Sequence, residues 1–382
     1  MAAFSPADDR FMRLALRLAM RGYGLTSPNP MVGAVLVREG RVLGVGWHKG
    51  AGLPHAEVEA IRDAERRGFS PRGAALYVTL EPCSTRGRTP PCVEAILRAG
   101  TRRVVAATRD PNPAHAGRGF ELLRAAGAQV DAGLYEREAA RLNEAFNHWI
   151  VHRTPWVTLK FAATLDGKIA TASGESKWIT GRRARAHAMR LRQGADAILI
   201  GAGTALADDP SLTVRLPGRP WARQPRRVVL DALARTPPSS RLASDAFRDR
   251  TVILVGPRAP AERVAALAEK VEVWRAPLSG EGRIDLRWTL ERLGEREVTS
   301  LLVEGGGEVH GSFVAAGLGH RLAAYFAPLI LGGRDARPAV GGEGVGSLRE
   351  APAVEEAAWR ALGPDLFVTG LIRPRATPGQ AS

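Results

Sequence analysis

The sequence is poor in cysteine, tyrosine and lysine, and it lacks a long hydrophobic run. Its 382 residues include two cysteines, four tyrosines and only five lysines among 54 basic residues. Two cysteines are too few for a disulfide-rich secreted scaffold. Without a run of about 18 apolar residues no transmembrane helix is expected, and the acidic pair Asp8 and Asp9 argues against a signal peptide. These features predict a cytoplasmic protein.

The overall composition is that of a globular protein with a surplus of positive charge. Hydrophobic residues make up 45% and charged residues 24%, and a length of 382 residues predicts two or three domains. Residues 1–150 hold 21 basic and 15 acidic side chains, and the remainder holds 33 and 24. Because the surplus is spread over both halves with no basic tail, it favours small anionic substrates over nucleic acid.

Apolar segments alternate between strand and helix patterns along the chain. In the first half, strands are expected over 31–37, 42–47, 74–80, 103–108 and 129–132, and helices over 8–22, 55–67, 91–100, 119–126 and 135–150. In the second half, strands are expected over 156–163, 197–200, 228–231, 251–255, 271–274, 301–304 and 322–327, with a helix over 182–194. This alternation predicts an α/β protein with helices on both faces of its sheets.

Local composition predicts how the chain is divided. Polar residues and a proline at 151–155 indicate a linker, and the segment 217–225, rich in proline and arginine, indicates a surface loop. We therefore expect one domain over 1–150, a second over 151–373 and a flexible tail over 374–382.

One group of residues in the first half has the composition of a zinc site. His55-Ala56-Glu57 opens an expected helix, Glu81-Pro82-Cys83 closes an expected strand, and Cys92 begins the next helix. One imidazole and two thiolates supply three ligands, which leaves a fourth position for a water whose pKa falls to about 7. Glu57 can reach that position without binding the metal, as a proton shuttle must.

This layout is the signature of zinc deaminases, although the gap between the cysteines is longer than the usual two-residue spacer. Gly87 and the neighbouring prolines can turn the chain back, so that both sulfurs still reach the metal. The alternative is that His55 only begins a helix and the two thiols fill the core. The combined spacing favours the metal site.

The second half contains several segments typical of a nucleotide site. They are 162–170, 173–180, 201–204, 208–215 and 303–308, the last with three glycines between an expected strand and an expected helix. Such glycines let backbone N–H groups approach a pyrophosphate. The Gly-x-Gly-x-x-Gly fingerprint is absent, and a flexible turn is the alternative explanation for the glycines.

Taken together, these motifs resemble the bifunctional deaminase–reductases of riboflavin biosynthesis. The segments that carry the resemblance include Thr26–Ala34, Gly46–His48, His55–Glu57 and Glu81–Cys92, and it extends over about residues 8–370. It implies a cytidine-deaminase-like three-layer αβα domain followed by a dihydrofolate-reductase-like α/β domain.

The resemblance also implies an activity. The first half would deaminate 2,5-diamino-6-(ribosylamino)-4(3H)-pyrimidinone 5′-phosphate with the help of zinc. The second half would reduce the ribosyl group with NADPH, giving 5-amino-6-(ribitylamino)uracil 5′-phosphate. The implied partner is this phosphorylated pyrimidine, with no nucleic acid and no membrane, and the implied assembly is a homo-oligomer.

Individual roles follow from the same resemblance. In the first half it implies zinc ligands at His55, Cys83 and Cys92, a proton donor at Glu57, and substrate contacts from Asn29, His48, Arg88, Asp110 and Asn112. In the second half it implies NADP contacts from Ala162, Trp178, Thr204, Asp208, Gly306, Gly307, Glu308, Val309, His310, Gly311 and Ser312. It implies substrate contacts there from Lys160, Ser176, Arg192, Leu212, Arg215 and Glu304. The two arginines of this last set suit a ribose phosphate.

Two positions depart from the family pattern. Many members have histidine where this chain has Thr85, and members often have serine where it has Ala232. Threonine cannot carry a charge, so a substrate contact at Thr85 is lost or replaced, and Ala232 leaves only a backbone contact.

Two other functions fit part of the sequence. One is a deaminase acting on RNA or on a free nucleoside, which would leave the second half without a role. The other is a zinc-stabilised binding protein without turnover, which would have no need of an acid–base group such as Glu57 beside its metal.

Overall fold

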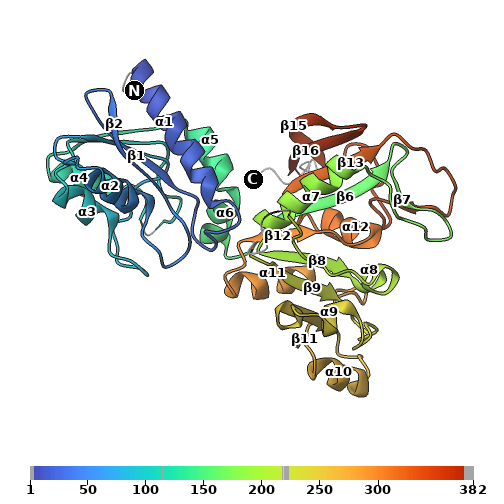
Figure 1. Ribbon diagram of the computed structural model, residues 1–382. Helices are drawn as coiled ribbons and strands as arrows, with labels where there is room; N and C mark the ends of the chain where they lie inside the picture. Colours follow the sequence, from blue (N-terminus) through green and yellow to red (C-terminus); the bar gives the residue numbers. More distant parts are fainter. Residues whose placement is uncertain (1–3, 114, 217, 219–222, 374–382) are drawn as a thin grey trace. The chain divides into compact units, whose positions relative to one another are not determined.

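The computed structural model describes residues 4–113, 115–216, 218 and 223–373 (Figure 1). The tail expected at 374–382 and part of the expected loop at 217–225 lie outside the described residues. The chain divides into two compact units, Met1–Arg153 and Thr154–Ser382. In the described part of the chain, every helix is too short or too polar to cross a membrane.

The first unit is built around a five-stranded sheet in the order β2-β1-β3-β4-β5. Its strands are β1 (Gly33–Arg38), β2 (Arg41–Trp47), β3 (Ala75–Val78), β4 (Arg103–Ala106) and β5 (Gln129–Ala132). Its helices are α1 (Pro6–Ala19), the 3₁₀ turn η1 (Met20–Gly22), α2 (Ala56–Arg66), α3 (Cys92–Arg98), α4 (Arg118–Ala125), α5 (Glu136–Leu142) and α6 (Glu144–His152).

Helices cover both faces of this sheet. On one face, Leu36, Leu76 and Val104 pack with apolar residues of α2, α3 and α4. On the other face, Val35 and Tyr77 pack with residues of α1 and with Ala139 of α5. Successive strand residues therefore face opposite layers, as the two-residue period of a strand requires, and the unit has three layers.

The second unit is built around a nine-stranded sheet in the order β11-β10-β9-β8-β12-β6-β13-β16-β15. Its strands are β6 (Trp156–Thr164), β8 (Ala197–Gly201), β9 (Arg226–Leu230), β10 (Thr251–Val255), β11 (Glu272–Arg275), β12 (Ser300–Val303), β13 (Arg321–Ala327), β15 (Ala353–Leu362) and β16 (Asp365–Arg373). A separate pair is formed by β7 (Lys168–Ala170) and β14 (Arg337–Pro338). The helices are α7 (Arg182–Gly194), α8 (Ala202–Asp208), α9 (Arg241–Ser244), η2 (Arg248–Arg250), α10 (Ala261–Ala268), α11 (Leu286–Glu295) and α12 (Gly307–Ala315).

The strands from β11 to β13 are parallel, and their side chains are buried on both faces. Leu199, Val228 and Leu301 pack on the side of α11 and α12. Ile198, Val229 and Leu302 pack on the opposite side, with residues of α9 and α10. Strands buried on both faces appear in a sequence as continuous apolar runs, so these strands could be predicted from the sequence.

One expectation was wrong. The single helix expected over 135–150 is divided at Asn143, whose backbone leaves the helical region with φ −116° and ψ 25°. The Asn143 side chain instead accepts a hydrogen bond from Met31 N and donates one to Met31 O. The following helix α6 then continues to His152, into the segment expected to be a linker.

The hairpin β15–β16 was not expected from the sequence. Strand β15 is exposed along almost its whole length, and the acidic pair Glu355 and Glu356 interrupts any apolar alternation. The register shifts between Glu355 and Ala358, where Glu356 has φ 51°. An exposed, irregular edge strand gives no periodic signal.

Candidate functional site

The sheet topology of the first unit brings the expected site residues to one edge. Strands β3 and β4 are parallel, so the segments that follow them, with Cys83 and Asp110, leave at the same edge. Strand β1 is antiparallel to β3, so its start, preceded by Asn29, lies there as well. Strand β2 ends at this edge too, because Gly33 pairs with Trp47, and His48 follows Trp47 directly.

His55, Cys83 and Cys92 converge at this edge. One ligand atom from each lies within 4.8 Å of the other two. The Nδ1 of His55 is 3.2 Å from the Cys92 sulfur and 3.5 Å from the Cys83 sulfur. His55 precedes the first residue of α2, and Cys92 is the first residue of α3, so both ligands sit on rigid helix starts.

This geometry fits a zinc ion. Zinc–nitrogen and zinc–sulfur bonds of about 2.0 and 2.3 Å in a tetrahedron place the two ligand atoms about 3.5 Å apart, close to the observed separations. The Nε2 of His55 lies 3.2 Å from the Thr89 hydroxyl, which can fix the ring so that Nδ1 faces the sulfurs.

The two thiols share their protons unevenly. Hydrogen bonds from the Cys92 thiol, from His55 and from the Cys92 N–H outweigh burial and lower the pKa of Cys83 to about 4. The pKa of Cys92 is raised, because its thiol is hydrogen-bonded to the Cys83 sulfur and buried. Zinc binds cysteine as the thiolate, so Cys83 is already in the form that the metal takes, and Cys92 would lose its proton on binding.

Glu57 lies in the first turn of α2 and is 3% exposed. Its Oε2 is buried and has no hydrogen-bond partner among the described residues. Burial raises the pKa of Glu57 to about 7, against the opposing attraction of His55. A carboxyl group buried this way beside a metal site can hold or release a proton near neutral pH.

Asn29 and His48 lie together at the sheet edge that carries the metal ligands. The Nδ2 of Asn29 is 3.1 Å from Nε2 of His48, and Nδ1 of His48 is 3.2 Å from Pro54 O. The His48 ring meets the His55 ring edge-on at a centroid distance of 5.2 Å. The structure therefore brings both predicted substrate residues next to the metal ligands.

Asp110 and Asn112 lie on a turn that one buried carboxylate fixes. Glu81, 4% exposed, accepts hydrogen bonds from the backbone N–H groups of Asp110, Gly117 and Gly119 at 3.1, 2.9 and 2.9 Å. A Cβ at Gly119 would lie 2.2 Å from Pro82 O, so only glycine allows this close packing. Because Glu81 and Pro82 directly precede Cys83, the turn is fixed to the strand end that carries a metal ligand.

Arg88 is exposed on the loop between the two cysteines. Its substrate role stays a prediction. Thr85, on the same loop, lies 3.3 and 3.4 Å from the two ring nitrogens of His115.

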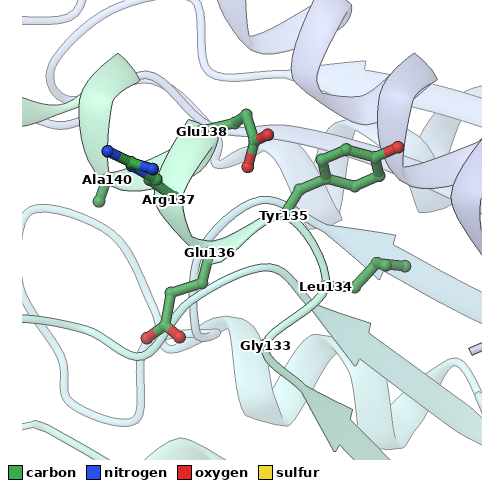
Figure 2. Close-up of a pocket in the computed structure, with 7 residues that line it drawn as sticks. All are labelled: Gly133, Leu134, Tyr135, Glu136, Arg137, Glu138 and Ala140. Carbon is green, nitrogen blue, oxygen red and sulfur yellow. The ribbon is translucent and has the colours of Figure 1, made fainter. Parts of the chain in front are cut away.

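A different depression in the first unit contains none of these residues. It has a volume of about 580 Å³ and is lined by the segment from Gly133 to Glu138 and by Ala140 (Figure 2). The Tyr135 ring points toward α1, where its hydroxyl donates to Asp9, and Glu136 and Arg137 point away from it. The Tyr135–Asp9 hydrogen bond connects the start of α5 to α1, and the residues that line this depression do not form a set of converging reactive groups.

The second unit has two adjoining cavities at the carboxyl ends of its central strands. The first, here called the Lys160 cavity, has a volume of about 300 Å³, and the second, the Arg337 cavity, about 420 Å³. They share lining from Ile169, Ser176, Thr204, Asp208 and Gly306. Ligands of open parallel sheets bind at this edge.

A buried carboxylate lies between two cations in the Lys160 cavity. Glu304 accepts from Nε and Nη2 of Arg192 at 2.8 Å each, and Lys160 Nζ lies 3.7 Å from it. Burial opposes ionisation, but Arg192 and Lys160 outweigh it and lower the pKa of Glu304 to about 2. Arg192 is thus held by Glu304 where it lines the cavity, and the substrate contacts expected from Arg192 and Arg215 stay predictions.

Most of the residues expected at the cofactor and substrate sites line the two cavities. The Lys160 cavity includes Lys160, Ala162, Ser176, Trp178, Arg192, Thr204, Asp208, Leu212, Glu304, Gly306 and His310. The Arg337 cavity adds Gly307, Glu308 and Val309. Trp178 is 71% exposed, so its indole is accessible to a planar ring.

Gly311, Ser312 and Arg215 are not among the lining residues of either cavity. A Cβ at Gly311 would lie 2.1 Å from Gly341 O, so this glycine packs α12 against a neighbouring segment. Ser312 accepts from Arg283, and Arg215 donates to Thr213. Ala232, the other departure, uses its carbonyl to accept from Gly256 N.

The glycines that do line the cavities fit a dinucleotide. A Cβ built on Gly203 meets no atom within 4 Å, so the Arg337 cavity is open above it. Gly306 N donates to Thr204 Oγ1 at 3.0 Å, just before the start of α12. The backbone N–H groups in the first turn of α12 follow this contact, and the start of a helix suits a pyrophosphate. Arg337 adds a cation to the lining of this cavity.

Sequence reasoning missed four residues that hold or line these sites. Glu81 and Thr89 flank the metal ligands, and their positions inside the cysteine motif were a signal that could have been used. Asn143 holds the segment that carries Asn29 through Met31, and Arg337 lines a cavity. These last two are too distant in sequence from any motif to be found without the fold.

Comparisons with known proteins agree with this division. Residues 5–108 match the family described as the cytidine and deoxycytidylate deaminase zinc-binding region, and residues 155–368 match the RibD C-terminal domain. The riboflavin biosynthesis protein RibD of Bacillus amyloliquefaciens is 42% identical over 95% of this chain and 96% of its own length. RibD of Escherichia coli K12 is 41% identical over 94% and 98%.

Solved structures give the same result. RibD of Acinetobacter baumannii superposes with a TM-score of 0.85 at 34% identity, over 96% of this chain and 99% of that one. The Thermotoga maritima diaminohydroxyphosphoribosylaminopyrimidine deaminase/5-amino-6-(5-phosphoribosylamino)uracil reductase superposes with a TM-score of 0.81 at 34% identity and the same coverage. The expected fold class, a deaminase-like domain followed by a reductase domain, is confirmed. The chain belongs to the RibD family of bifunctional riboflavin-biosynthesis deaminases and reductases.

Proposed function

We propose that the chain catalyses two consecutive steps of riboflavin biosynthesis. The first unit deaminates 2,5-diamino-6-(ribosylamino)-4(3H)-pyrimidinone 5′-phosphate, and the second reduces the ribosyl group to give 5-amino-6-(ribitylamino)uracil 5′-phosphate. The observation that carries the proposal is the convergence of His55, Cys83 and Cys92 beside the buried Glu57. Family membership over both units supports the pairing of the two activities.

In the first step, His55, Cys83 and Cys92 would hold zinc. Such a zinc would lower the pKa of a water molecule and so supply a nucleophile for the ring carbon that carries the amine. Glu57 would take a proton from the attacking water and donate one to the departing nitrogen, so that ammonia leaves as the C–N bond breaks. Asn29 and His48 orient the pyrimidine from one side, and the turn with Asp110 and Asn112 does so from the other.

In the second step, the adjoining cavities hold NADPH and the opened ribosyl group. NADPH supplies the hydride that reduces the sugar carbon. The backbone of the first turn of α12 would hold the pyrophosphate, and the exposed Trp178 would offer its ring to the ligand. Lys160, held beside Glu304 in the cavity lining, would orient the sugar oxygen.

The remaining expectations belong to the same proposal. The domains are 1–150 and 151–373. The enzyme works in the cytoplasm, where reducing conditions keep Cys83 and Cys92 available as thiolates. It assembles as a homo-oligomer, which size-exclusion chromatography with light scattering would test.

The division of labour is tested by His55→Ala. The variant loses a metal ligand, so ammonia release from the diaminopyrimidine substrate should fall below detection and bound zinc should be lost. NADPH oxidation with the deaminated intermediate supplied should stay within about twofold of the parent enzyme. If both activities fall together in a variant that keeps its far-UV circular dichroism and its thermal transition, the assignment of one step to each unit is wrong.

A further inference from the structure

The Thr85 departure has a counterpart on the neighbouring turn. Thr85 lies two residues after the ligand Cys83, and its Oγ1 is 3.4 Å from Nδ1 and 3.3 Å from Nε2 of His115. An imidazole therefore occupies the space beside position 85, but it comes from a segment 30 residues further along the chain.

The turn that carries His115 is built to hold it in place. The N–H groups of His115 and Ala116 donate to Asn112 O at 2.9 Å each, and Arg118 N donates to His115 O at 2.9 Å. Asn112 N in turn donates to Asp110 Oδ1 at 2.9 Å. Because Glu81 fixes both ends of this turn through Asp110, Gly117 and Gly119, the His115 backbone is tied to the same strand end as Cys83.

The charges around His115 favour an anion. The acidic groups near it are buried and engaged, since Glu81 accepts three backbone N–H groups and Asp110 accepts from Asn112. Arg86 is exposed on the loop that carries Thr85. A half-buried imidazole against a loop with an exposed arginine suits a phosphate oxygen.

We propose that His115, seated against Thr85, binds the phosphorylated ribose of the substrate at the rim of the metal site and sets the preference for the phosphorylated pyrimidine. This inference rests on the proposed deaminase function. Thr85 is a positioning residue, because its side chain packs on the imidazole. His115 supplies the contact that Thr85 cannot make.

The test compares two substrates on matched variants. Deamination is followed by ammonia release, with the diaminopyrimidine 5′-phosphate and with the same compound after removal of its phosphate. For His115→Ala we expect KM for the phosphorylated substrate to rise about ten- to hundredfold, the loss typical of one hydrogen bond to a charged group. We expect kcat to stay within about threefold and KM for the dephosphorylated compound to be unchanged.

A double variant makes the test specific to the location of the imidazole. In Thr85→His/His115→Ala the imidazole returns to the same space from the other side of the contact, so at least half of the lost affinity, on a logarithmic scale, should be regained. Zinc content and NADPH-dependent reduction of the supplied intermediate should equal those of the parent in every variant.

Two results would overturn the inference, and a third concerns the function on which it rests. An unchanged KM in His115→Ala, or an equal loss for both substrates, excludes a phosphate contact at His115. Failure of the double variant to regain affinity excludes the replacement of one position by the other. Absence of ammonia release from the zinc-loaded parent enzyme would instead reject the proposed function itself.

Discussion

The two units assemble their sites in different ways. In the first unit, the metal ligands lie between residues 55 and 92, each at the end of a helix or strand at one sheet edge. In the second unit, the cavity residues run from Lys160 to Pro338 and come from strands β6, β7, β8 and β14, helices α7, α8 and α12 and several connecting segments. A metal site needs a few strong donors at fixed distances, whereas a dinucleotide needs many weak contacts along an extended surface.

This difference predicts different sensitivities to substitution. The first site depends on single atoms, so one conservative change should abolish its activity. The second site depends on a cluster of buried charges and on the shape of the backbone. A single substitution there should therefore lower the stability of the unit as well as its affinity for the ligand. The following predictions sharpen or break this contrast.

The largest effect is expected for Glu57→Gln. The amide keeps the volume of the side chain but cannot move a proton, so kcat for ammonia release should fall about 10²- to 10⁴-fold. Zinc content and NADPH oxidation with supplied intermediate should not change. Glu59→Gln, on the same turn of α2 and paired with Lys49, is the matched control and should stay within about threefold. Substantial ammonia release by Glu57→Gln would exclude this residue as the proton shuttle.

A smaller effect on catalysis, with a clear cost in stability, is expected for Glu304→Gln. Loss of the carboxylate leaves the buried Arg192 guanidinium without its counter-charge, which costs about 3–5 kcal/mol when a buried pair is broken on one side. Reductase activity should fall about a hundredfold and the thermal transition of the second unit should shift down, with deamination unchanged.

The matched control for that variant is Glu295→Gln, which removes the exposed ion pair with Arg292. Exposed pairs contribute little, so neither activity nor the thermal transition should move measurably. Equal effects of the two substitutions on activity and on the thermal transition would show that the contribution of Glu304 does not come from its burial.

The smallest effect on activity is expected for Asp8→Asn, which tests the frame of the first unit rather than its site. Asp8 is 2% exposed and accepts from Tyr77 and Arg103 at 2.7 Å each. Burial opposes its ionisation, but these bonds and those from Ser5 hold the pKa of Asp8 well below its ordinary value of 3.8. The variant should lose about 1–3 kcal/mol of stability at pH 7, measured by urea denaturation with amide exchange in β3 and β4.

The pH dependence of that loss has a definite sign. A carboxyl with a lowered pKa stabilises the fold above the unfolded-state value, and this contribution fades as the pH falls through 3.8 toward the folded-state pKa. The stability difference between parent and variant should therefore be full at pH 7 and shrink below pH about 4. Asp9→Asn, at an exposed position on the same helix, should show a clearly smaller difference at both pH values.

Much of the fold and of the metal site could be predicted because the signal is local. Strand β10 and helix α7 have the predicted bounds, since buried parallel strands and helices with regular apolar spacing leave a period in the sequence. His55, Cys83 and Cys92 could be recognised from residue type and spacing alone, because few other sets of donors supply a zinc site with an open position.

The rest was decided by the tertiary structure. Three contacts illustrate this: Asn143 with Met31, Glu81 with Asp110, and Thr85 with His115. Each joins segments at least 29 residues apart, and no local sequence pattern encodes such a contact. The sequence by itself determined most of the elements, the donor set and the family. Only the fold determined that Arg192 is held by Glu304 and that an imidazole lies beside Thr85, because both depend on which strand ends meet at one sheet edge.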